Sequence, residues 1–373
     1  MNLPDIPIIR IIDRMTRSNT CFALYRLPWT DEPILVLQQD APAETMDSLE
    51  QLNGKSGFLL APFSKPDRHP IVLIRPDRVV RDWSDIGSTL LEFESACSWE
   101  NLEEAQEASA QELSEKGLQQ AYMEAFERFI VPLREQRFQK LVLSRKAEES
   151  LPAGFSPLEA FVRACNSYPR MMISLCHTPQ TGTWLGSTPE IILSGHQEEW
   201  NTVALAGTMP MEGDTMPTEW STKNQEEQAF VSEYIRRTVK RFGTKLTEKG
   251  PYTARAGQLV HLKTDFRFQL KSTDHLGNIL QELHPTPAVF GLPKEEACTF
   301  IAENEGYDRS YYSGIIGWID PQGDTTLYVN LRCMHLTGGK AVLYAGGGIL
   351  PQSTPDTEWE ETRHKMNTMH NIL

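Results

Sequence analysis

The chain has 373 residues, of which 40% are apolar, with 36 Lys and Arg against 50 Asp and Glu. This length and composition exclude a disordered chain, a collagen-like repeat and a disulfide-stabilised miniprotein, because the chain can bury a large core. The net charge of −14 argues against a general nucleic-acid or acidic-membrane binder, since both partners are polyanions that need a basic surface. A small anionic substrate held by a few local cations stays compatible with this charge.

The cysteines are scattered, without a C-x-x-C pair or a histidine spacing typical of zinc. They are Cys21, Cys97, Cys165, Cys176, Cys298 and Cys333. We interpret them as reduced core thiols of a cytoplasmic protein. Residues 1–17 lack the continuous apolar segment of a signal peptide, and no later stretch reaches the ~18 apolar residues of a membrane span. The sequence therefore predicts a cytoplasmic protein without a membrane partner.

Short apolar runs typical of strands, separated by clusters of Pro, Asp and Gly, occupy the N-terminal part of the chain. We expect these strands at residues 21–26, 34–37, 57–61 and 71–74. From Trp99 to Lys116 the chain is acidic and rich in Ala, Gln and Glu, which indicates an exposed connector or a solvated helix. We therefore place a boundary near residue 105, between a β-rich N-terminal part (1–105) and a catalytic region (106–373).

The second part contains further strands and helices. A helix over 118–130 leads into a strand at 138–147, and strands are predicted at 171–177, 183–185, 191–194, 202–206, 259–270, 314–319, 327–336 and 341–345. Helices are expected at 157–166, 224–241, 294–301 and 355–369. Several strands follow one another through tight polar turns such as 337–340, which favours large antiparallel sheets packed with helices over a βαβ order. The predicted fold class is α+β.

The last predicted helix carries a regular set of charges. Ser353-Thr354-Pro355 supplies a capping hydroxyl followed by proline at the first helical position, which marks a helix start. Glu358, Glu361 and Lys365 follow at spacings of three and four, so they share one face of the helix. On a helix taken alone, such a pattern indicates a solvated face with one ion pair.

Two other features favour a metal site. In the helix over 224–241, the apolar stripe extends toward the N-terminus onto Glu227 rather than Glu226, so a carboxylate leads into the buried face. The segment 345–349 leaves an apolar strand through three glycines, which lets backbone N–H groups approach an anion, although a bulge or bend explains it equally well. Carboxylates from separate helices form an oxygen shell that suits Mg²⁺.

Several segments, in this order along the chain, resemble one family of enzymes. They are Lys140–Arg145, Leu185–Glu190, Ala206–Thr208, Leu283–Val289, Tyr312–Gly314, Leu331–Arg332, Tyr344–Ile349 and Glu358–Thr362. Together they resemble the chorismate-utilising enzymes, most of all the isochorismate synthases. The resemblance implies the fold of that family, whose N-terminal region completes one compact α+β unit, although residues 1–105 carry no matching motif.

The resemblance implies that water attacks one ring carbon of chorismate while hydroxyl leaves another, giving isochorismate. Such a displacement needs a base for water, an acid for the leaving hydroxyl and clamps for two carboxylates. Lys140 matches the base and must be neutral to act. Glu190 matches the general acid, and its position between Pro189 and apolar residues favours desolvation that keeps its proton available.

The resemblance also implies the metal and substrate ligands. Glu227 and Glu361 match direct Mg²⁺ ligands, and Glu358 matches a ligand or a water-mediated neighbour. The matching substrate-binding residues are Gly207, Thr208, His284, Tyr312, Arg332, Gly346 and Lys365. Arg332 and Tyr312 would hold the enolpyruvyl carboxylate, and a guanidinium can do so with two hydrogen bonds.

Some of these assignments have counterarguments in the sequence. A lone histidine before proline, as His284 is, fits a structural role at least as well as a catalytic one. Asn224 and Gln228 stand where the family usually has Asp and His around the first metal glutamate, and Gly347 replaces an alanine. None of these is the direct ligand, so metal binding should survive these departures.

Three functions stay open at this point. The favoured one is isochorismate synthase, an isomerase with chorismate as its substrate. Its product supplies menaquinone or a siderophore, with menaquinone preferred. We expect no glutaminase or nucleic-acid partner, and a monomer or weak homodimer. The second is another chorismate reaction, either elimination to salicylate or amination. Lys140 argues against anthranilate synthase, and the His284-Pro-Thr-Pro run is unlike salicylate synthases. The third, a non-catalytic chorismate-binding protein, is disfavoured because base and acid are both retained.

Overall fold

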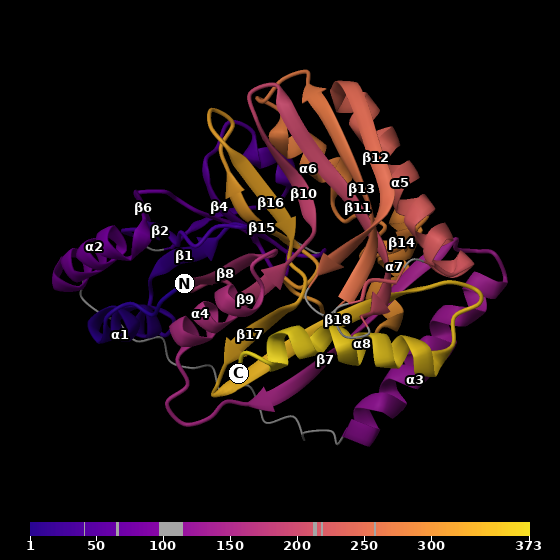
Figure 1. Ribbon diagram of the computed structural model, residues 1–373, viewed down its shortest axis with the longest axis horizontal. Helices are drawn as coiled ribbons and strands as arrows, with labels where there is room; N and C mark the ends of the chain where they lie inside the picture. Colours follow the sequence, from indigo (N-terminus) through magenta and orange to yellow (C-terminus); the bar gives the residue numbers. More distant parts are fainter. Residues whose placement is uncertain (41, 65–66, 97–114, 212–214, 218, 257–258) are drawn as a thin grey trace.

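Two antiparallel sheets form the framework of the protein (Figure 1). The computed structural model describes residues 1–373 except 41, 65–66, 97–114, 212–214, 218 and 257–258. The predicted boundary at residue 105 and Cys97 fall outside the described residues. Helices pack on the outer faces of both sheets, which confirms the predicted α+β class.

Each sheet has nine strands. In spatial order, the first consists of β14 (Gly291–Leu292), β7 (Lys140–Ser150), β18 (Lys340–Ile349), β17 (Cys333–Thr337), β9 (Gly182–Thr188), β8 (Met172–Thr178), β1 (Cys21–Arg26), β2 (Ile34–Gln38) and β6 (Arg78–Arg81). The second consists of β12 (Gly243–Ala256), β13 (Leu259–Leu270), β11 (Glu199–Pro210), β10 (Ile191–His196), β16 (Thr325–Val329), β15 (Ile315–Ile319), β4 (Gly57–Ala61), β5 (Ile71–Ile74) and β3 (Glu44–Met46).

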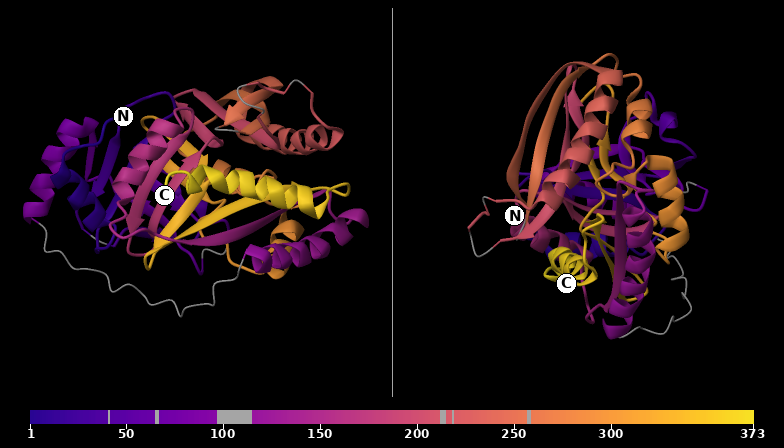
Figure 2. Two further views of the ribbon diagram at one scale, coloured as in Figure 1. Left: turned by 60° about the horizontal axis from the view of Figure 1, so that its bottom comes forward. Right: turned by 90° about the vertical axis from the view of Figure 1, so that its right-hand side faces the viewer.

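The helices divide between the two sheets. They are α1 (Ile6–Met15), α2 (Asp82–Ala96), α3 (Glu115–Arg134), α4 (Pro157–Ser167), α5 (Thr222–Phe242), α6 (Leu276–Leu283), α7 (Lys294–Asn304) and α8 (Pro355–His370), with a 3₁₀ turn at Leu49–Leu52. One apolar cluster joins α1, α2, α4 and α8 to the first sheet, and another joins α5 and α6 to the second. A third cluster fills the space between the sheets. The helix α8 lies along β18 (Figure 2).

Strands β1 and β4 show why continuous apolar runs form buried strands here. Along β1, Phe22 and Leu24 pack under the helices, whereas Ala23 and Tyr25 face the other sheet. Both faces of these strands are buried, so the sequence has no polar alternation. Strands on both sides of the predicted boundary pair directly, β1 with β8 and β4 with β15. The division at residue 105 stays a prediction.

The helix starts follow local capping rules only in part. Ser156 and Ser221 accept hydrogen bonds from the backbone N–H groups of Glu159 and Asn224 and so begin α4 and α5. The predicted hydroxyl cap of α8 is wrong, because Thr354 at the cap position makes no side-chain bond to the helix backbone. Its Oγ1 lies 2.8 Å from the Oγ1 of Thr357 instead.

Two other predictions about elements need correction, and several elements had not been predicted. The strand expected at 327–336 is two strands, β16 and β17, which lie in different sheets. Segment 345–349 does not leave its strand, because it stays paired with β7 to the end of β18. Sequence patterns also missed α1, α2, α6 and the largely exposed strand β12.

Two further properties of the described residues concern their helices and their cysteines. None of their helices is both long enough and apolar enough to cross a membrane. Cys21, Cys165, Cys176, Cys298 and Cys333 are free thiols, and all except the half-buried Cys298 are buried.

Candidate active site

Two of the connections by which the chain passes from one sheet to the other lie next to each other. Residues 189–190 connect β9 to β10, and residues 330–332 connect β16 to β17. The backbone N–H of Val329 donates to the carbonyl of Glu190 at 2.9 Å, and that of Ser187 donates to the carbonyl of Arg332 at 3.0 Å. These bonds fix Glu190 and Arg332 at the junction of the two sheets.

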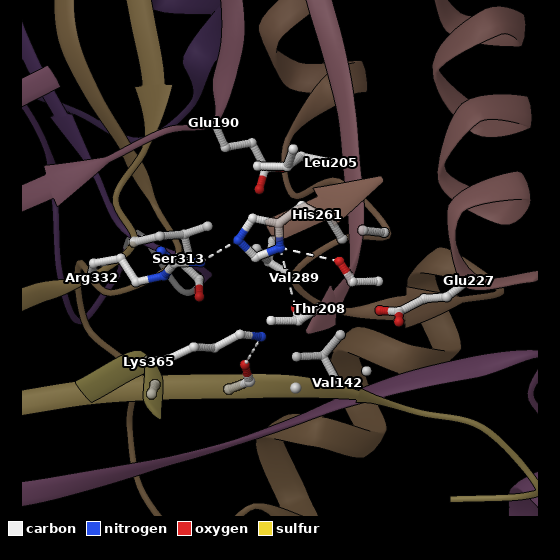
Figure 3. Close-up of a pocket in the computed structure, with 18 of the residues that line it drawn as sticks. Val142, Glu190, Leu205, Thr208, Glu227, His261, Val289, Ser313, Arg332 and Lys365 are labelled. Carbon is white, nitrogen blue, oxygen red and sulfur yellow. Dashed lines mark hydrogen bonds between the residues drawn. The ribbon is translucent and has the colours of Figure 1, made fainter. Parts of the chain in front are cut away.

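A cavity at this junction gathers most of the predicted site (Figure 3). Its lining includes Glu190, Gly207, Thr208, Glu227, Tyr312, Arg332, Gly346 and Lys365. They come from both sheets and from α5 and α8. The cavity volume of about 50 Å³ is far below the roughly 300–1,000 Å³ of typical ligand pockets, so a ring-sized substrate requires side chains to move aside.

Glu190 is held in the form expected of a general acid. Its side chain is buried, and burial raises its pKa from 4.5 to about 7, against the opposing charges of Lys140 and Arg332. Thr286 Oγ1 is 3.4 Å from Glu190 Oε1. A substantial fraction of this carboxyl is therefore protonated near neutral pH.

Each predicted metal carboxylate is paired with a lysine. Lys140 Nζ lies 2.9 Å from Glu227 Oε1, Lys365 Nζ lies 2.7 Å from Glu361 Oε1, and Lys223 contacts Glu358. Lys223 had no role in the sequence analysis, although its position one turn before Glu227 on α5 places it at the same end of the helix. Each of the three carboxylates therefore has one lysine amino group beside it.

The glycines of β18 let these carboxylates approach the strand. A Cβ atom on Gly347 would lie 3.2 Å from Glu361 Oε1 and 3.3 Å from Glu358 Oε2, and one on Gly348 would collide with Glu227 Oε1. Burial and the adjacent Glu361 raise the pKa of Glu358 to about 7, and its buried Oε2 has no hydrogen-bond partner. In the part of the chain that is described, no three acidic, His or Cys side chains already form a metal cluster.

These carboxylates nevertheless fit a hard divalent cation. All three side chains offer carboxylate oxygens, and Glu358 Oε2 has no hydrogen-bond partner, although Lys223 contacts the other oxygen of that carboxylate. Gln228 stays out of this arrangement, because its Nε2 donates to the carbonyl of Ala204 and to Thr264 Oγ1.

Arg332 lies against a histidine that the sequence analysis did not single out. Its Nη2 is 2.9 Å from His261 Nε2, and its buried Nη1 has no partner. The other ring nitrogen of His261 lies 3.1 Å from the carbonyl of Gly207 and 3.2 Å from Thr208 Oγ1. Burial, together with the charges of Arg332 and Lys365, holds the pKa of His261 well below its ordinary value.

His284 lies outside the cavity lining. It ends α6, and its Nε2 donates to the carbonyl of Pro62 at 3.0 Å. Burial lowers its pKa to about 4, so it is neutral at physiological pH. This geometry favours the structural interpretation of His284 over the predicted substrate contact.

A sequence model described as "Chorismate binding enzyme" matches residues 74–373. The chain belongs to the chorismate-binding enzymes. It is 32% identical over 200 residues to isochorismate synthase EntC of Escherichia coli strain K12, covering 52% of this chain and 51% of the relative. It is also 32% identical over 250 residues to the salicylate biosynthesis isochorismate synthase of Pseudomonas aeruginosa, covering 65% and 52%. The matches thus span about half the length of these curated relatives.

The fold of this chorismate-binding enzyme also has solved counterparts. The menaquinone-specific isochorismate synthase MenF of Escherichia coli superposes with a TM-score of 0.77 and 21% identity, covering 100% of this chain and 92% of MenF. The N-terminal strands, which lie partly outside the matched family segment, therefore belong to the same architecture.

Proposed function

We propose that this chorismate-binding enzyme is an isochorismate synthase that requires Mg²⁺. The observation that carries the proposal is the buried, protonatable carboxyl of Glu190 in the cavity that Arg332 lines, together with the fully buried Lys140. The Nζ of Lys140 lies 2.9 Å from Oε1 of Glu227, which also lines the cavity. A base, an acid and an anion-binding guanidinium are the groups that exchange of a ring hydroxyl for water requires.

In the proposed reaction, Arg332 Nη1 and Lys365 hold the substrate's carboxylates. The neutral amine form of Lys140, no longer paired with Glu227, takes a proton from water as the water oxygen bonds to one ring carbon. The ring double bonds shift, the C–O bond of the hydroxyl on another ring carbon breaks, and Glu190 gives its proton to that departing hydroxyl. One water is consumed and one is released, so the reaction is an isomerisation. Glu227, Glu358 and Glu361 would hold Mg²⁺, which supplies positive charge for the ring carboxylate.

The nature of the nucleophile separates this proposal from amination. Water needs no second subunit, so the chain alone should convert chorismate without glutamine or ammonia. The supply of isochorismate to menaquinone rather than to a siderophore, the cytoplasmic location and the monomeric or weakly dimeric state stay predictions.

Product analysis tests the proposal directly. The purified chain is incubated with chorismate and Mg²⁺, with and without ammonium, and the products are separated by chromatography. We expect isochorismate in both cases and no product when EDTA replaces Mg²⁺. Salicylate as the primary product, or an aminated product that needs ammonium, would assign the chain to another chorismate reaction.

A further inference from the structure

His261 accepts a hydrogen bond from one terminal nitrogen of the Arg332 guanidinium, and the other terminal nitrogen has no partner. Arginine has only N–H donors, so the 2.9 Å contact from Nη2 requires His261 Nε2 to be the acceptor. Nη1 remains without a partner although it is buried, and Arg332 lines the cavity. The unsatisfied donor is the one available to an anion in the cavity.

The acceptor state of His261 Nε2 is set by the opposite side of the ring. The carbonyl of Gly207 can only accept, so the 3.1 Å contact requires the proton on Nδ1. Gly207 has a φ of +71° at a register shift in the β11–β13 pairing, which turns its carbonyl toward the imidazole. A protonated ring would put an N–H against Nη2 and break the contact.

We infer that His261 is a positioning residue for the substrate-binding arginine: the β11 bulge fixes its Nδ1–H tautomer, and its Nε2 then holds Arg332 with Nη1 directed at a substrate carboxylate. Arg332 needs such support because its backbone has a φ of +48°, a region that non-glycine residues rarely adopt. A series of hydrogen bonds thus connects the bulge at Gly207 in β11, through His261, to Arg332 at the crossover between the sheets (Figure 3).

The inference rests on the proposed function for its substrate, chorismate, and its test separates binding from turnover. His261→Leu removes both ring contacts at similar size. His261→Gln keeps an oxygen acceptor near the position of Nε2, whereas His261→Asn keeps only the donor to Gly207. His177→Leu is the matched control, since His177 is another buried histidine with both nitrogens bonded, to Thr183 and to the Ser18 carbonyl, and it lies outside the cavity lining.

Chorismate Kd is measured by calorimetry with Mg²⁺, alongside KM and kcat, after circular dichroism has confirmed folding. We expect His261→Leu and His261→Asn to raise Kd and KM by about ten- to a hundred-fold, the range for a lost hydrogen bond to a charged group, with much smaller changes in kcat. His261→Gln and His177→Leu should stay close to the parent protein.

Equal affinity of the Gln and Asn variants overturns the inference, and this comparison holds even if the Leu variant does not fold. A fall in kcat with unchanged Kd also overturns it, because His261 would then act on the reacting atoms. If the parent binds chorismate but forms no isochorismate, the proposed function fails, while the Kd series still tests the role of His261.

Discussion

The raised pKa of Glu190 predicts a pH-dependent stability that does not depend on any substrate. A carboxyl whose pKa is 4.5 when exposed and about 7 in the folded protein favours folding only while it is protonated. Its contribution is complete below pH 4.5 and is lost as the pH rises through 7. Full ionisation of the buried group costs about 3 kcal/mol, an upper value that follows from the size of the shift.

Glu190→Gln removes this dependence because an amide does not ionise. Relative to the parent, the variant should gain up to about 3 kcal/mol of unfolding free energy between pH 5 and pH 8. Urea unfolding followed by tryptophan fluorescence at several pH values measures the difference. Glu124→Gln on the exposed face of α3 serves as the control and should show no such trend. A difference between parent and Glu190→Gln that stays flat with pH refutes the reasoning.

The same substitution tests the proposed general acid. Without its proton donor, Glu190→Gln should lose roughly 10²–10⁴-fold in kcat, as positioned proton-transfer groups do. In the parent, the rate should fall about tenfold per pH unit above 7, since the acid must be protonated. A variant that keeps the parent's rate and pH profile would show that another group protonates the leaving hydroxyl.

Three further outcomes follow from the site. Glu227→Gln or Glu361→Gln should abolish Mg²⁺-dependent turnover without unfolding the protein, because each removes one charged oxygen ligand. Undiminished activity of both variants would rule out the proposed metal site. Lys140→Ala should lower kcat by ~10²–10⁴-fold while calorimetry shows chorismate binding largely kept, and a parent-like rate would mean that another group activates water. Gly348→Ala should prevent Mg²⁺ binding, measured by calorimetry, because its Cβ would strike Glu227 and Lys140. Gly347→Ala should be tolerated. Equal behaviour of the two variants would contradict the proposal that Gly348 makes room for Glu227 as a metal ligand.

Local sequence determined the elements whose burial is uniform or regular. The runs at 57–61 and 71–74 match β4 and β5 residue for residue, because both faces of these strands are buried and every position is apolar. Strand β12 was missed for the converse reason, since most of its side chains are exposed and its sequence shows no apolar pattern. The charges of α8 were found from helical periodicity alone.

The site itself depended on pairings that no local pattern encodes. Periodicity brought Glu227 to a buried face, and the family resemblance supplied Lys140, Glu190 and Arg332. Neither indicated His261, which in the sequence is one histidine of a predicted strand. The bulge of β11 places the carbonyl of Gly207 at one of its ring nitrogens, and the crossover before β17 places Arg332 at the other. Secondary-structure propensity and periodicity depend on neighbours in the sequence, whereas the hydrogen-bond partners of a side chain depend on which strands lie side by side. Here those strands belong to two different sheets, and the chain passes from one sheet to the other at the active site.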